Sequence, residues 1–215
     1  MHFDIHVHTT LSPCSCLTLP QILNQARDKG LHGVCITDHD TMSVRKSLRE
    51  GIQDDGLCVI FGVEYATEAG DFLLFGPFDN LPAGLPARKV LMHAENVRGA
   101  AIAAHPFRQG RSTDKRLIEQ GLCRIVEGIN GRNLPTENIK TAEWAQRYGI
   151  KLAGGSDAHS IDELGRIATR FHTEIKTRKD LILALRNGDF SLAPGSITNF
   201  SASNALREAA LCQAD

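Results

Sequence analysis

Short apolar runs alternate along this chain with longer stretches of helical periodicity, and turn residues such as Gly, Pro, Asn and Asp separate them. Apolar runs of about four to eight residues are typical of buried strands, whereas longer amphipathic stretches are typical of helices. The pattern predicts strands at about 3–7, 33–37, 57–61, 72–75, 100–104, 125–129, 151–155 and 170–174. It predicts helices at about 19–29, 41–50, 87–98, 135–148 and 178–187. Strands that alternate with helices favour parallel β/α units, and therefore an α/β fold.

Capping residues mark the first and the last of these helices. Thr18 precedes the first helix as a candidate N-cap, Pro20 fits its first turn, and Gly30 follows its end. Thr177 and Asp180 open the last helix in a similar way. These residues strengthen the prediction of a helix at both places.

The size and the composition are those of one globular domain. The chain has 215 residues, of which 42% are hydrophobic and 23% are charged. We expect one domain over residues 1–200, followed by a peripheral C-terminal tail over residues 201–215. A formal net charge of -1 and an aromatic content of 6% provide neither a positive field nor a stacking platform for nucleic acid. Nucleic acid is therefore expected as a partner only in the form of a short oligonucleotide.

The sequence pattern predicts neither a membrane partner nor a secretory leader. No stretch approaches the ~20 apolar residues of a membrane span, and the chain starts without a charged segment that leads into an apolar one. Three of the six cysteines, Cys35, Cys58 and Cys123, lie in apolar segments, as reduced buried thiols do. We therefore expect a cytoplasmic protein.

The first predicted strand carries two histidines, His6 and His8, on either side of Val7. Residues i and i+2 of a strand face the same side, so the two imidazoles project together. Two neutral imidazoles on one rigid edge supply half of a metal site, although a His-x-His pair alone is equally typical of surface histidines.

Side chains that bind metals also follow the ends of later strands. They are His39, Glu64, His105, Asp157 and His159. In β/α barrels the C-terminal ends of the strands share one rim, where active sites are assembled, so these residues are expected to converge with the His6–His8 pair. Each has a structural interpretation of its own, as Asp157 has as a helix N-cap. Their recurrence at the same end of successive strands favours one shared site.

Imidazole and carboxylate ligands suit zinc, manganese or iron. Seven such ligands are too many for one tetrahedral ion, so we expect two or three divalent metal ions, with Glu64 able to bridge two of them. Clustered cations bind an anionic oxygen centre and generate hydroxide from bound water. Both abilities indicate hydrolysis of a phosphate ester.

Five blocks of the sequence, in this order, resemble the PHP family, which is named after polymerase and histidinol phosphatase. They are Asp4-Ile-His6-Val-His8-Thr9, Thr37-Asp38-His39-Asp40-Thr41, Gly62-Val-Glu64, Ala104-His105-Pro106-Phe107 and Gly155-Ser156-Asp157-Ala158-His159. The resemblance implies a distorted seven-stranded β/α barrel, the TIM-like PHP type, with a di- or trinuclear metal centre. It assigns one ion to His6, His8, Glu64 and Asp157, a second to Glu64 and His105, and a third to His39 and His159.

The chain departs from the family pattern at two positions. Many members carry a histidine or an aspartate shortly after the His-x-His pair, where this chain has Ser12-Pro13-Cys14. Many also carry a histidine on the strand after Glu64, where this chain has Asp71. The Cys14 thiolate and the Asp71 carboxylate are therefore candidate ligands. A loop thiol and a turn residue are the corresponding structural alternatives.

The resemblance and the ligand types together predict a phosphoesterase that hydrolyses a small phosphomonoester through a metal-activated hydroxide. Arg108 is the first candidate for clamping the phosphate and Arg132 is the second, because a planar guanidinium suits bidentate contact. A surface salt bridge is the structural alternative for both arginines. Asp38 and His159 are candidates for protonating the leaving group, a role that metal binding would deny to His159.

Three other functions fit parts of the same pattern. A nuclease or phosphodiesterase acting on nucleotides or short oligonucleotides would use the same ligands. Hydrolysis of a C–N bond is a second alternative, because related barrels use similar ligands for it. A catalytically silent barrel that serves as an accessory or binding module would have lost several ligands, whereas all seven are present here.

Overall fold

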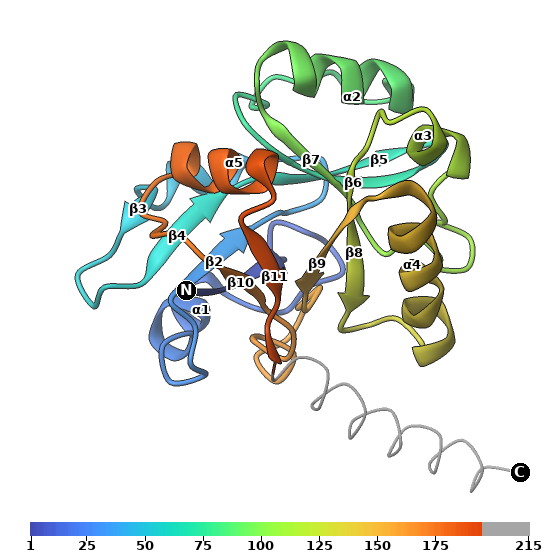
Figure 1. Ribbon diagram of the computed structural model, residues 1–215. Coiled ribbons are helices and arrows are strands. Elements are labelled where there is room, and N and C mark those ends of the chain that lie inside the picture. Colours follow the sequence, from blue (N-terminus) through green and yellow to red (C-terminus); the bar gives the residue numbers. More distant parts are fainter. Residues whose placement is uncertain (195–215) are drawn as a thin grey trace, which may run out of the picture.

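The computed structural model describes residues 1–194, and these residues form two mixed β-sheets with helices packed around them (Figure 1). The expected C-terminal tail at 201–215 lies outside the described residues, as does the segment 195–200 of the expected domain. None of the helices in residues 1–194 has the length and the apolar character that a membrane span requires.

The elements confirm most of the predicted strands and helices. The strands are β1 (His2–Val7), β2 (Gly33–Ile36), β3 (Gly51–Ile52), β4 (Cys58–Phe61), β5 (Val63–Thr67), β6 (Gly70–Phe75), β7 (Ala100–Ala103), β8 (Ile125–Asn130), β9 (Lys151–Gly155), β10 (Thr169–Phe171) and β11 (Phe190–Leu192). The α-helices are α1 (Leu19–Gln25), α2 (Ala87–Asn96), α3 (Lys115–Glu119), α4 (Pro135–Tyr148) and α5 (Arg178–Asn187). Thr18 and Thr177 cap α1 and α5 through capping boxes, as predicted.

The helix predicted at 41–50 is wrong. This segment forms only a short 3-10 helix, Ser43–Lys46, and the two-residue strand β3 follows it. Met42 and Val44 are its only buried residues. Its apolar stripe is therefore too short for tertiary packing to hold a longer helix.

The expectation of parallel strands is wrong in both sheets, since β3, β10 and β11 also pair antiparallel with their neighbours. β5 pairs antiparallel with β6, and β6 pairs antiparallel with β7. A tight turn between Thr67 and Gly70 permits this hairpin, because Gly70 adopts a φ of 114°, a conformation that favours glycine. The sequence pattern did not reveal β5 because only Gly62 separates it from β4.

The two sheets meet on two sides without forming one closed ladder. Their strand orders are β11-β10-β1-β2-β4-β3 and β5-β6-β7-β8-β9. Isolated parallel bridges between Val7 and Ala158, and between His39 and Glu64, connect them. The expected seven-stranded barrel is thus not present as one closed sheet. One reason is that β10 pairs antiparallel with the N-terminal part of β1. The residues that follow β9 therefore contact only the C-terminal end of β1.

Strand β1 is buried on both faces and brings polar side chains into the interior. Phe3 and Ile5 belong to a hydrophobic cluster between the sheet and its covering elements. His6 and His8 alternate with these residues and are also fully buried. Their ring centroids lie 5.0 Å apart, which confirms that the i, i+2 spacing places the two imidazoles side by side.

Strand β9 comes close to β1 because Gly155 has no side chain. A Cβ atom at this position would lie 2.6 Å from His6 Cβ and 2.6 Å from Glu127 Oε1. We expect Gly155→Ala to lower the free energy of unfolding by about 1–3 kcal/mol, because the strands must move apart to relieve the overlap. Chemical denaturation measures this change. Lys151→Ala, at an exposed position of the same strand, is the control, and wild-type stability in Gly155→Ala would contradict the close packing.

Candidate metal centre

The seven imidazole and carboxylate side chains expected to share a site lie together in the interior, around Glu64. The Oε2 atom of Glu64 lies 3.3 Å from His6 Nε2, 3.1 Å from His8 Nε2 and 2.9 Å from His39 Nδ1. Its Oε1 atom lies 2.8 Å from His105 Nε2. One carboxylate at the start of β5 thus contacts imidazoles from three other segments of the chain.

Asp157 joins the same group from the other edge of the five-stranded sheet, where β9 ends. Its Oδ1 atom lies 3.6 Å from His6 Nε2, 3.4 Å from His8 Nε2 and 3.5 Å from His159 Nδ1. Asp157 and His159 follow β9 directly, and the bridge between the residues Val7 and Ala158 brings this loop to the end of β1. The structure therefore brings all seven expected residues together.

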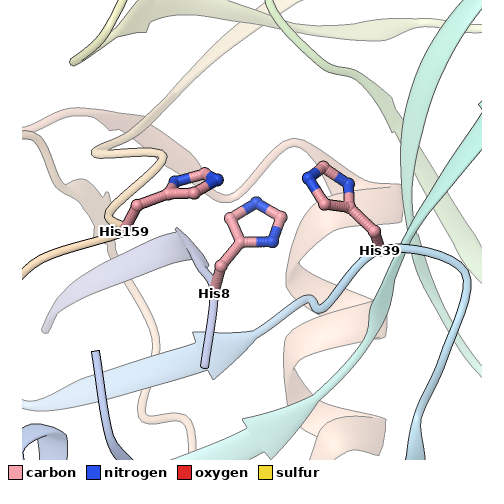
Figure 2. Close-up of side chains that lie close together, drawn as sticks. All are labelled: His8, His39 and His159. Carbon is pink, nitrogen blue, oxygen red and sulfur yellow. The ribbon is translucent and has the colours of Figure 1, made fainter. Parts of the chain in front are cut away.

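Three groups of side chains offer ligand atoms that all lie within 4.8 Å of one another. They are His6, His8 and Asp157; Glu64, Asp71 and His105; and His8, His39 and His159. Figure 2 shows the third group, in which imidazoles from the end of β1, the loop after β2 and the loop after β9 lie close together. The three groups overlap with the three sets that the family resemblance implies, but Glu64 lies outside the first group, Asp71 joins the second and His8 joins the third.

Several buried atoms of this centre lack a hydrogen-bond partner among residues 1–194. They are His6 Nε2, His8 Nε2, Glu64 Oε2 and His105 Nδ1. A buried polar atom without a partner costs about 1–3 kcal/mol, and folded proteins rarely retain one without compensation. A divalent cation would satisfy imidazole and carboxylate lone pairs at once. The donor set therefore fits zinc, manganese or iron.

Hydrogen bonds outside the group set the tautomers of two histidines. His6 Nδ1 lies 2.8 Å from Glu127 Oε1, and His159 Nδ1 lies 2.8 Å from the carbonyl oxygen of Asp157. Both partner oxygens only accept hydrogen bonds, so the Nδ1 atoms carry the protons. The Nε2 lone pairs of His6 and His159 are then directed away from these partners and free to bind a metal.

Asp38 holds His8 through Ser12. The Asp38 carboxylate accepts hydrogen bonds from Thr9 N, Thr9 Oγ1 and Ser12 Oγ, each 2.7 Å long. Because Ser12 Oγ donates to Asp38, it accepts from His8 Nδ1 at 3.1 Å and leaves the Nε2 lone pair of His8 free. These contacts occupy the Asp38 carboxylate. They favour a positioning role for Asp38 over its expected role in protonating a leaving group.

Glu127 in β8 is a residue of the site that sequence reasoning missed. It is fully buried, and its carboxylate accepts hydrogen bonds from the ring of His6, from His105 N at 2.9 Å and from Asn130 Nδ2 at 2.8 Å. It therefore orients two expected ligands without lying in their groups. The available signal was a carboxylate inside the apolar run Ile125–Asn130, where charged residues are rare.

Arg108 supports Asp157 rather than standing free at the rim. Its Nη2 atom lies 2.8 Å from Asp157 Oδ2 and donates to Asn130 Oδ1 at 2.8 Å. Its Nε atom donates to Asn133 Oδ1 at 3.0 Å. With these three partners the guanidinium has a positioning role that the sequence analysis did not foresee.

Two other arginines are half-exposed beside the site. The side chain of Arg132, expected from the sequence, is 39% exposed and lies 3.7 Å from Glu163, which in turn accepts from His159 N. The side chain of Arg111, which the sequence analysis missed, is 46% exposed and lies 3.1 Å from Asp71 Oδ2. Each guanidinium is thus one contact away from the buried group and still accessible to a bound anion.

The imidazoles and carboxylates of the centre stabilise one another's charges. Burial alone would lower the pKa of His6, but its carboxylate neighbours raise that pKa well above its usual value. Burial would raise the pKa values of Glu64 and Asp157, yet the charge on His6 holds both well below their usual range. Burial and the neighbouring His8 lower the pKa of His159 to about 4, which favours the neutral form that binds metals.

Two expected ligands have strained backbones. His105 and Asp157 adopt φ angles of 31° and 54°, in the left-handed region that side chains other than glycine rarely occupy. Such a conformation costs about 1–3 kcal/mol and persists where surrounding contacts impose it, often at functional sites. Here the bond from His105 N to Glu127 and the ion pair of Asp157 with Arg108 provide those contacts.

The two departures from the family pattern both lie next to expected ligands. Cys14 is exposed in the loop after β1, and its Sγ atom lies 3.1 Å from His159 Nε2. Asp71 in β6 is buried, and its Oδ2 atom lies 3.8 Å from His105 Nε2. Both side chains lie beside an expected ligand, so both remain candidate ligands.

Several solved structures share this fold. PsfC of Pseudomonas syringae has a TM-score of 0.71 at 18% identity, with 97% of this chain and 98% of that chain covered. A two-domain protein of Bacteroides vulgatus, containing a predicted PHP-like metal-dependent phosphoesterase, has a TM-score of 0.67 at 18% identity, with coverage of 94% and 69%. The lesion-specific endonuclease PfuEndoQ of Pyrococcus furiosus has a TM-score of 0.64 at 19% identity, with coverage of 89% and 58%.

Sequence comparisons also find similar proteins. An uncharacterized protein of Methanocaldococcus jannaschii is 29% identical over 179 residues, which are 80% of this chain and 70% of the relative. A "probable phosphatase" of Caldicellulosiruptor saccharolyticus is 24% identical over 199 residues, with coverage of 77% and 83%. Residues 135–190 match the family model PHP_C, described as PHP-associated. These matches support the resemblance of the chain to the PHP family, which the five sequence blocks carry.

We expect Glu127→Gln to weaken metal binding about 10–100-fold, although Glu127 is not itself a proposed ligand. The amide nitrogen of glutamine would face a donor in either orientation, because His6, His105 and Asn130 all donate to the carboxylate. Calorimetric titration of the metal-free protein with Mn²⁺ or Zn²⁺ measures the affinity. Glu143→Gln, at an exposed position of α4, is the matched control, and unchanged affinity in Glu127→Gln would contradict the positioning role.

Proposed function

We propose that this chain is a metal-dependent phosphoesterase that hydrolyses a small phosphomonoester. The observation that carries the proposal is the set of buried ligand atoms without hydrogen bonds on His6, His8 and Glu64, which lie together among imidazoles and carboxylates. A silent binding module would carry the free-energy cost of this arrangement without a cation to offset it. The ligand set is therefore better explained by metal-dependent chemistry.

The names of similar proteins support the class of reaction. The Bacteroides vulgatus protein is described as containing a predicted PHP-like metal-dependent phosphoesterase, the Caldicellulosiruptor saccharolyticus relative is named a probable phosphatase, and the Pyrococcus furiosus protein is an endonuclease. All three names denote the hydrolysis of a phosphoric ester. We carry over this class of bond as the proposed target of the chain.

The proposed ions share the three groups of ligand atoms. One ion would be held by His6, His8, Glu64 and Asp157, a second by Glu64, Asp71 and His105, and a third by His39 and His159. When bound, divalent zinc, manganese or iron supplies Lewis-acid polarisation of phosphoryl oxygens and activation of water. The partners of their Nδ1 atoms direct the Nε2 atoms of His6, His8 and His159 inward.

The arginines divide the remaining tasks. Arg111 and Arg132 are accessible, so we assign them to the phosphate, whose oxygens suit the planar guanidinium. Arg108 keeps Asp157 in its strained conformation, and the structure supports this positioning role more strongly than direct contact with substrate. If His159 binds metal through Nε2, Nδ1 keeps its proton and donates it in a hydrogen bond to the carbonyl oxygen of Asp157. His159 is then no longer a candidate for protonating the leaving group.

We predict that His8→Ala lowers the turnover of a generic aryl phosphate by more than about 100-fold, because His8 belongs to two of the three ligand groups. Steady-state kinetics in the presence of added Mn²⁺ or Zn²⁺ measures the loss, and circular dichroism checks that the fold is kept. His93→Ala, at an exposed position of α2, should retain wild-type turnover. Activity retained in His8→Ala would overturn the proposed role of His8.

We predict that Arg132→Ala and Arg111→Ala each raise KM for the aryl phosphate about 10-fold, because a charge-assisted hydrogen bond contributes roughly 1.5–3 kcal/mol. Initial rates over a range of substrate concentrations separate KM from kcat. Arg116→Ala is the control, since the Arg116 side chain is 77% exposed on α3 and pairs only locally with Asp114. An unchanged KM in both variants would place the phosphate elsewhere.

A comparison of mono- and diesters tests the proposed substrate class. The likeness to PfuEndoQ keeps one alternative open, a nuclease or phosphodiesterase acting on nucleotides or short oligonucleotides. An aryl phosphate and a bis-aryl phosphate, each assayed with zinc, manganese and iron, distinguish the two. Faster hydrolysis of the monoester supports the proposal, whereas faster hydrolysis of the diester supports the alternative.

A further inference from the structure

We propose that the Cys14 thiolate is a metal ligand at the His8–His39–His159 group and makes this one position of the centre selective for thiophilic divalent cations. The inference rests on the metal centre of the proposed function and specifies the chemistry of one of its positions. It is carried by the contact of Cys14 with His159, by a buried nitrogen of His8 without a hydrogen bond in the described part of the chain, and by the way the Cys14 loop is held.

Cys14 and His159 direct their ligand atoms at each other. Cys14 Sγ lies 3.1 Å from His159 Nε2, and His159 Nδ1 is bound to the carbonyl oxygen of Asp157 at 2.8 Å. Since Nδ1 carries the proton, Nε2 offers a lone pair, and the thiol proton lies between sulfur and nitrogen. A cation that takes the place of this proton would be bound by both atoms. Binding would release the thiol proton to solvent, as metal binding to cysteine does.

A second nitrogen of the same group has no hydrogen-bond partner, although it lies 3.1 Å from Glu64 Oε2. His8 Nε2 is buried, lacks a hydrogen bond within the described residues, and belongs with His39 and His159 to one group of ligand atoms. Figure 2 shows these three imidazoles close together. A thiolate added to imidazoles gives the mixed sulfur and nitrogen set that zinc prefers and that manganese binds less well.

The loop that carries Cys14 is fixed to the backbones of both neighbouring histidines. Ser15 Oγ donates to the carbonyl oxygen of His8 at 2.9 Å and to that of His159 at 3.1 Å. Cys16 N donates to the carbonyl oxygen of His159 at 3.0 Å. Ser12 Oγ, at the start of the loop, contacts the His8 ring. These bonds hold the residues on both sides of Cys14 beside His8 and His159.

Cys16 provides a matched control two residues away. It is exposed, like Cys14, but its Sγ atom lies 3.4 Å from the carbonyl oxygen of His159 and so faces backbone rather than a ring nitrogen. Cys35, Cys58 and Cys123 are buried in the hydrophobic clusters. Replacing Cys16 therefore removes one exposed thiol of the same loop without touching the proposed ligand set.

Cobalt titration of the metal-free full-length chain tests the inference. A thiolate bound to Co²⁺ gives an intense near-ultraviolet charge-transfer absorption that nitrogen and oxygen ligands do not give. We expect this absorption in the wild type and in Cys16→Ser, and its loss in Cys14→Ser. An equal absorption in Cys14→Ser, or its absence from cobalt-loaded wild type, would overturn the inference. Circular dichroism of each variant confirms that the fold is kept.

The same samples separate this inference from the proposed function. Wild-type protein that hydrolyses aryl phosphate but shows no thiolate absorption would overturn the ligand role of Cys14 and leave the phosphoesterase proposal standing. Wild-type protein that shows the absorption but hydrolyses no mono- or diester would overturn the function and leave the ligand assignment standing. Loss of the absorption in Cys14→Ser, with other cobalt bands retained, supports one thiolate position within a larger centre.

Discussion

The buried negative charge of Glu127 is the contact on which the geometry of the site depends. Removing a carboxylate from water is costly, and here hydrogen bonds from the His6 ring, the His105 backbone and the Asn130 amide offset that cost. The network continues, because Asn130 also accepts from Arg108, which pairs with Asp157. One side chain in β8 thereby orients ligands that come from β1, from the end of β7 and from the end of β9.

This arrangement brings together groups that would repel one another or remain unpaired in a simple core. Buried carboxylates and imidazoles meet at Glu64 and Asp157, and two of the residues involved, His105 and Asp157, occupy strained backbone conformations. Mutual stabilisation of opposite charges accounts for part of the cost, as the lowered pKa of Glu64 shows. The remaining unpaired lone pairs point to a cation as the missing partner. Stored strain and unpaired ligand atoms at one place are typical of a functional centre.

Much of the site could be predicted from sequence because its residues follow directly from strand geometry. The two-residue period of a strand places His6 and His8 together, and residues after successive strands meet at one end of the fold. The turn at Gly70, which makes β5 and β6 antiparallel, depends on a single backbone conformation that periodicity does not encode. Glu127 carries no motif, since its role arises from partners in three distant segments. Arg111 was missed for the same reason, because its nearness to Asp71 depends on the fold.

The metal content of the chain tests the central claim most directly. The purified protein, prepared without chelators, can be analysed by inductively coupled plasma mass spectrometry before and after incubation with manganese or zinc. The arrangement around Glu64 predicts two or three bound ions of zinc, manganese or iron per chain. Fewer than one tightly bound ion per chain, not restored by added manganese or zinc, would contradict the account and would favour a binding module without metal-dependent activity.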